Sequence, residues 1–70
     1  MEWNPVTETL HRVVSGDLEL LAWNEPDAWA WAVIRVSGPD PERNVVLGTG
    51  EAGSEEEAKT KAERHAAAPG

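Results

Sequence analysis

The chain has 70 residues, no cysteine, a net charge of −7 and four tryptophans with no phenylalanine or tyrosine. This length allows one small domain, and a chain without cysteine can form neither disulfides nor thiolate metal sites. The acidic balance disfavours direct binding to nucleic acid or to an anionic membrane, because both need clustered Lys and Arg. The N-terminus lacks the pattern of a signal peptide, and no apolar run is long enough to span a membrane, so we expect a cytoplasmic protein.

The first third of the chain predicts a lead-in followed by two strands. Residues 1–8 are expected to be irregular, with Trp3 clipped onto the edge of a sheet. Residues 9–14 (TLHRVV) predict a strand, and the Gly-Asp pair at 16–17 predicts a hairpin turn after it. Residues 18–23 (LELLAW) predict the second strand. Its alternating faces would carry Leu18, Leu20 and Ala22 on one side and Glu19, Leu21 and Trp23 on the other.

Residues 28–36 (AWAWAVIRV) alternate with period two, which predicts a third strand after a Pro-containing turn. One face would carry Trp29, Trp31, Val33 and Arg35, and the other Ala28, Ala30, Ala32, Ile34 and Val36. A loop rich in Gly and Pro follows at 37–43. Residues 44–52 (NVVLGTGEA) predict the fourth strand, where Gly48 and Gly50 share a face with Val46. Two glycines so spaced indicate close approach by another element.

Residues 54–67 predict one C-terminal helix. Ser54 is a good N-cap, Glu57 completes a capping box, and the three glutamates 55–57 complement the helix dipole. Ala58, Ala62 and Ala66 form a stripe of small residues, with His65 beside it. A helix of this length is unstable alone in water, so it must lie on the sheet. The predicted fold is α+β: one domain with a three- to four-stranded antiparallel meander over 9–52, followed by the helix packed on one face.

The alanine stripe decides which sheet face the helix covers. Small helix residues need large side chains opposite them, so we expect the helix on the face with Trp29 and Trp31. The opposite face then has no element left to cover it. On this strand that face comprises Ala28, Ala30, Ala32 and Ile34. It is either ordinary surface or a contiguous apolar patch that mediates an interface. We favour the patch and predict a homodimer through it.

No group of residue types indicates catalysis. His11 and His65 fall on different elements, the first expected as an exposed strand residue and the second as a cation at the helix C-terminus. The stretch GTGEAG at 48–53 matches G-x-G-x-x-G, but the parallel strand and the acidic ribose ligand of a dinucleotide site do not follow it. We therefore expect no enzyme activity, no cofactor and no metal.

Carboxylates gather in three places along the sequence. They are Asp17 with Glu19, Glu25 with Asp27, and Glu55 with Glu56 and Glu57. One interpretation is that they solvate the surface and complement the helix dipole. The other is that they form an acidic surface that imitates a nucleic-acid backbone. Such a surface would compete for a groove rich in Lys and Arg on a protein partner.

Three motifs carry a resemblance over residues 18–66: W-x-W-x-V at 29–33, G-x-A at 50–52 and S-x-E-E-A at 54–58. Their arrangement resembles very short proteins of bacteriophages and mobile elements. Small acidic phage proteins include anti-CRISPR proteins, and the resemblance implies an inhibitor that binds a CRISPR–Cas effector complex and blocks access of nucleic acid. The passage 50–58 is also similar to the end of HicB-type antitoxin domains, which implies a toxin as the partner instead.

Overall fold

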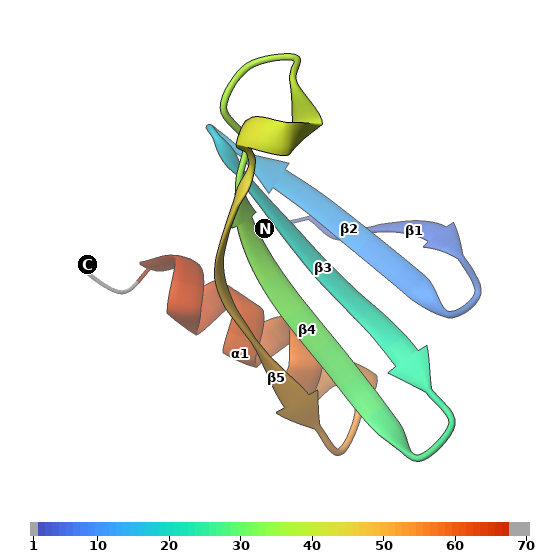
Figure 1. Ribbon diagram of the computed structural model, residues 1–70. Helices are drawn as coiled ribbons and strands as arrows, with labels where there is room; N and C mark the ends of the chain where they lie inside the picture. Colours follow the sequence, from blue (N-terminus) through green and yellow to red (C-terminus); the bar gives the residue numbers. More distant parts are fainter. Residues whose placement is uncertain (1, 68–70) are drawn as a thin grey trace.

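The computed structural model describes residues 2–67. They form strands β1 (Asn4–Thr7), β2 (Leu10–Ser15), β3 (Leu18–Glu25), β4 (Ala28–Arg35) and β5 (Val45–Ala52), the short 3₁₀ helix η1 (Pro41–Arg43) and helix α1 (Glu55–Ala67). The five strands pair antiparallel in chain order, and α1 lies across one face of the sheet (Figure 1). The predicted α+β meander with one C-terminal helix is confirmed. Within the described residues, no helix is both long and apolar enough to cross a membrane.

The N-terminal segment differs from the prediction. An irregular lead-in is expected over residues 1–8, but four of these residues form β1 against β2. Pro5 is compatible with this strand because β1 is an edge strand, where a missing N–H removes no bond from the sheet. The register slips between Pro5 and Thr7, which shortens the pairing. Met1 of the predicted lead-in lies outside the described residues.

The helix covers the face that carries the two tryptophans of β4, as predicted. Leu20 of β3 lies opposite Val33 of β4, and both side chains are fully buried. Ala58 and Ala62 of α1 are fully buried against the same face, where the tryptophans of β4 pack beside them. The short alanine side chains allow the helix to approach closely, and the large side chains of the sheet fill the remaining space.

Trp3 joins the N-terminus to the helix. Its side chain packs against both core clusters of the sheet and helix. The indole N–H donates a hydrogen bond to Glu63 at 3.1 Å, and Nζ of Lys59 lies 5.7 Å from the ring centroid. The segment before β1 is therefore part of the packing between α1 and the sheet.

Gly48 and Gly50 mark close approaches to β5. A Cβ atom on Gly48 would lie 2.3 Å from Nε2 of His65, and one on Gly50 would lie 2.9 Å from Nε1 of Trp31. The predicted approach of another element is confirmed at Gly48, where it comes from α1; at Gly50 the neighbour is the tryptophan of β4. Val46 does not share this face, because the register slips between β4 and β5 and sets it opposite Ile34.

The predicted N-cap of α1 is confirmed. Oγ of Ser54 accepts a hydrogen bond from the backbone N–H of Glu57 at 3.1 Å. The Glu57 carboxylate lies 3.0 Å from Nζ of Lys61. The hydrogen bond from Lys61, its charge and a bond from the backbone N–H of Gly53 lower the pKa of Glu57 below its ordinary value of 4.5. The first turn of the helix is thus fixed by the N-cap Ser54 and by the contacts of Glu57 with Lys61 and Gly53, whereas the predicted capping box would have Glu57 accept from the N–H of Ser54.

Glu57→Gln is expected to lower the free energy of unfolding at neutral pH and to have no effect in strong acid. Because the pKa of Glu57 is lower in the folded chain, its carboxylate stabilises the fold above pH 4.5, and this contribution disappears as the pH falls through the folded-state pKa. Urea unfolding at neutral and acidic pH measures the difference. Glu56→Gln is the control, with an equally small effect at each pH; a Glu57→Gln difference that persists in acid would contradict the prediction.

Candidate functional site

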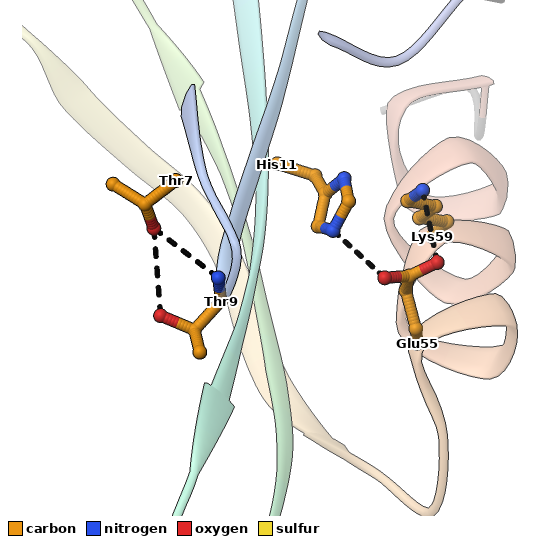
Figure 2. A network of polar contacts seen from close by, with 5 residues as sticks. All are labelled: Thr7, Thr9, His11, Glu55 and Lys59. Carbon is orange, nitrogen blue, oxygen red and sulfur yellow. Dashed lines mark hydrogen bonds and ion pairs between the residues drawn. The ribbon is translucent and has the colours of Figure 1, made fainter. Parts of the chain in front are cut away.

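Acidic side chains gather at one end of the sheet. In Figure 1 the β3–β4 turn and the β5–α1 connection lie at the bottom, and the β1–β2 turn lies at the right, at the same end of the antiparallel strands. The two turns are joined where the N–H of Asn24 donates to the carbonyl of Thr9 at 2.8 Å. Oγ1 of Thr7 accepts from the N–H of Thr9 at 3.2 Å, which fixes the first turn (Figure 2). We call the seven carboxylates found here the acidic end: Glu8, Glu25, Asp27, Glu51, Glu55, Glu56 and Glu57.

The structure brings together two of the three predicted carboxylate clusters. Glu25 with Asp27, and the three glutamates of the helix start, all belong to the acidic end. Asp17 lies in the β2–β3 turn at the opposite end of the sheet, 3.8 Å from Nε of Arg35. Glu19 lies on the sheet face away from α1, 2.9 Å from Nη2 of Arg12. The predicted cluster of Asp17 and Glu19 is therefore separate from the acidic end, and each of its two carboxylates is paired with an arginine.

Few cations lie at the acidic end. Lys59 and Lys61 of α1 are 3.4 Å from Glu55 and 3.0 Å from Glu57. The carboxylates of the acidic end that have no Lys or Arg partner within residues 2–67 are Glu8, Glu25, Asp27, Glu51 and Glu56. A concentration of one charge on a surface attracts oppositely charged partners over long range. The acidic end is thus a concentration of negative charge on the described surface.

His11 connects β2 to the first turn of α1 beside the acidic end. Its Nε2 lies 2.7 Å from Glu55, whose other oxygen lies 3.4 Å from Nζ of Lys59 (Figure 2). The prediction of an exposed strand residue is wrong: the His11 side chain is 14 % exposed. His11 pairs with Ala22 in the strand register, and α1 covers this face of the sheet. The histidine therefore ties the sheet to the residue that begins the helix.

The second histidine lies elsewhere. Nε2 of His65 is 2.9 Å from the carbonyl oxygen of Leu47, and its ring lies 5.5 Å from that of Trp31.

Within residues 2–67, no three His, Asp or Glu side chains converge as metal ligands do. The surface hollow beside β1 and β2 is lined by valines with Glu2, Asn4, Arg12 and Ser15. These side chains offer polar contacts rather than a nucleophile beside a base.

The sheet face away from α1 is covered by no other element within the described residues. We call it the open face. The strand registers give its side chains: Asn4; Leu10, Arg12 and Val14; Glu19, Leu21, Trp23 and Glu25; Ala28, Ala30, Ala32 and Ile34; and Val46, Thr49 and Glu51. The four predicted interface residues of β4 lie on it. Ala30 and Ala32 are only 5 % and 7 % exposed, because larger side chains of the neighbouring strands surround them. The accessible part of the open face is therefore made by those larger neighbours.

Sequence reasoning missed several residues of these two surfaces. Glu8 and Glu51 were not assigned to any cluster, although a meander places alternate turns at the same end of its sheet. Val14 and Val46, both more than half exposed, belong to the open face. Glu25 and Glu51 belong to both the acidic end and the open face, so the two surfaces adjoin. Comparison with family models, with curated proteins and with solved structures finds no match for this chain.

Proposed function

We propose that this chain is a non-enzymatic binding protein whose acidic end occupies the basic nucleic-acid groove of a protein partner, as an anti-CRISPR protein blocks a CRISPR–Cas effector complex. The observation that carries this proposal is the gathering of seven carboxylates at one end of the sheet, most of them without a Lys or Arg partner. A groove that holds nucleic acid presents Lys and Arg toward phosphates. Clustered carboxylates complement the same cations and compete for them.

The open face supports a second contact with the same partner. Charge complementarity raises the rate and specificity of association more than its affinity, whereas apolar burial contributes roughly 25 cal/mol per Å². Leu21 and Trp23 lie on this face beside the acidic end, and Trp23 donates a hydrogen bond to Glu25 at 3.0 Å. Tryptophan is among the residues enriched at energetic centres of interfaces. The partner would thus meet apolar side chains next to a rim of carboxylates.

An antitoxin-like protein that binds a toxin is the second candidate function. The open face favours it, because long-lived complexes bury more apolar surface than transient ones do. The two candidates differ in the surface that dominates binding. An inhibitor of a nucleic-acid groove depends on the acidic end and is sensitive to salt, whereas an antitoxin depends on the open face and is less so.

Asp27→Asn/Glu56→Gln is expected to weaken binding to a purified Cascade-type or Cas9-type effector by about tenfold, mainly by slowing association. Neither carboxylate has a Lys or Arg partner in residues 2–67, so the change removes charge without breaking an ion pair. The matched control, Glu2→Gln/Glu42→Gln, removes the same charge away from the acidic end, and neither of its carboxylates has a Lys or Arg partner within residues 2–67. Surface-based binding kinetics at two salt concentrations measure both variants.

Three outcomes separate the candidates. Selective weakening of the Asp27/Glu56 variant, with steep salt dependence, supports the acidic end as the binding surface. Equal weakening of both variants contradicts it, because net charge alone would then suffice. If the unaltered chain binds neither effector but captures a toxin, and Trp23→Ala abolishes this capture, the antitoxin candidate replaces the inhibitor.

A further inference from the structure

Strand β5 lies at the edge of the sheet, and two side chains of α1 reach its backbone. Nζ of Lys61 donates a hydrogen bond to the carbonyl of Glu51 at 3.1 Å. Nε2 of His65 lies 2.9 Å from the carbonyl of Leu47. Because a carbonyl oxygen only accepts, His65 must carry a hydrogen on Nε2 to make this bond. The two donors are one helical turn apart, and the helix runs antiparallel to the strand.

These two carbonyls belong to the outer edge of β5. In an antiparallel ladder, successive residues direct their N–H and C=O groups alternately toward and away from the neighbouring strand. Thr49 and Glu51 therefore share one direction, and Leu47, the residue inserted by the register slip, has no partner in β4. The carbonyls of Leu47 and Glu51 meet helix side chains instead of β4. An outer edge of this kind is a template for pairing with a strand of another molecule.

The two sheet edges are protected in different ways. β1 has four residues, a proline and a register slip, all of which discourage strand pairing. β5 has eight residues and carries no charge from Val45 to Gly50. Its Val45, Val46 and Leu47 are 52 %, 60 % and 37 % exposed. A register slip next to Leu47 is the protection that β5 has within its own strand.

We propose that the outer edge of β5 is a strand-pairing surface for β5 of a second copy, and that Lys61 and His65 hold it closed by occupying the carbonyls of Glu51 and Leu47. A second copy fits because antiparallel pairing centred on Gly48 sets Leu47 of each copy opposite Thr49 of the other. The same pairing places the two Glu51 side chains, and with them the two acidic ends, far apart. Like charges therefore do not oppose the pairing along the strand.

Gly48 is part of this closure. The His65 ring occupies the space that a side chain at position 48 would need, since a Cβ there would lie 2.3 Å from Nε2 and 2.6 Å from Cε1. The imidazole also packs against Trp31, with ring centroids 5.5 Å apart. Gly48→Ala therefore displaces the ring from the Leu47 carbonyl without changing any residue of the helix.

Lys61→Ala/His65→Ala is expected to self-associate at least about tenfold more tightly than the unaltered chain, measured by sedimentation equilibrium on the full chain. Thr60→Ala/Arg64→Ala is the matched control: it removes one positive charge from neighbouring positions of α1 and should leave self-association unchanged. Amide hydrogen exchange gives the second measurement. Exchange at Thr49 should slow with protein concentration in the Lys61/His65 variant, because its N–H becomes paired.

Two single variants keep the proposal testable if the double variant fails to fold. Gly48→Ala should also self-associate, and His65→Gln, which keeps a side-chain N–H donor, should behave as the unaltered chain does. A folded Lys61/His65 variant that retains the unaltered chain's mass would overturn the proposal, as would association that leaves Thr49 exchange unchanged. A homodimer through the open face, which the sequence predicts, would appear equally in the unaltered chain and is distinguished in this way.

Discussion

Leu20→Ala is expected to lower the free energy of unfolding by about 2–5 kcal/mol, the range for truncating a buried leucine. Leu20 of β3 is fully buried beneath α1, in the same core cluster as Val33 of β4 and Ala62 of α1. The chain is small, and small domains have only a few kcal/mol of net stability. The variant should therefore have a substantial unfolded population at room temperature. Urea unfolding followed by tryptophan fluorescence measures the loss.

Leu21→Ala is the matched control for this prediction. Leu21 is the next residue of the same strand, but it is half-buried on the open face and faces Ala32 across the ladder. Its truncation should cost about 1 kcal/mol, the value for losing partly buried methyl groups. Equal losses at the two positions would contradict the assignment of the two sheet faces. If Leu20→Ala has no folded population, Leu20→Val gives a smaller loss that can be measured.

The sheet and the helix could be predicted from the sequence because their signals are local. Period-two alternation over residues 28–36 sets the two faces of β4, and the capping residues fix the start of α1. The alanine stripe and the two tryptophans of β4 then identify the covered face, because close packing needs large residues opposite small ones. These inferences need only the geometry of one strand and one helix.

What the sequence did not predict depends on contacts between distant segments. β1 forms because the chain returns beside β2, which no pattern in four residues containing Pro5 indicates. Val46 changes face because one residue is inserted into the pairing with β4. The burial of His11 follows from the position of the helix start above it, 44 residues later in the chain. None of these features can be predicted from the local periodicity of the sequence.

The candidate site, like the fold, could be predicted from the sequence only in part. Clusters at 25–27 and 55–57 were evident as runs of carboxylates, and the meander brings them to one end. Asp17 and Glu19 looked equivalent in sequence, but an odd number of strand reversals places Asp17 at the other end, and alternation turns Glu19 onto the open face. The number of strands before a cluster therefore decides which carboxylates share a surface.

Ala62→Leu is expected to destabilise the fold by about 1–3 kcal/mol, because added methylene groups in a close-packed core force side chains or the helix to move. Ala62 is fully buried against the sheet, so a larger side chain would push α1 away from β3 and β4. Leucine and alanine have similar helix propensities, so the loss reports on packing. Ala67→Leu, at an exposed position of the same helix, should change stability by less than about 0.5 kcal/mol.

The double variant Leu20→Ala/Ala62→Leu tests whether these two residues share one space. Both lie in the same core cluster, and exchanging a large and a small side chain across it conserves volume. The double variant should therefore lose less stability than the sum of the two single losses, with a coupling of about 0.5–3 kcal/mol in a double-mutant cycle. If the two single losses of stability are strictly additive, Ala62 does not pack against Leu20. The assignment of the sheet face that α1 covers would then depend on the tryptophans of β4 alone.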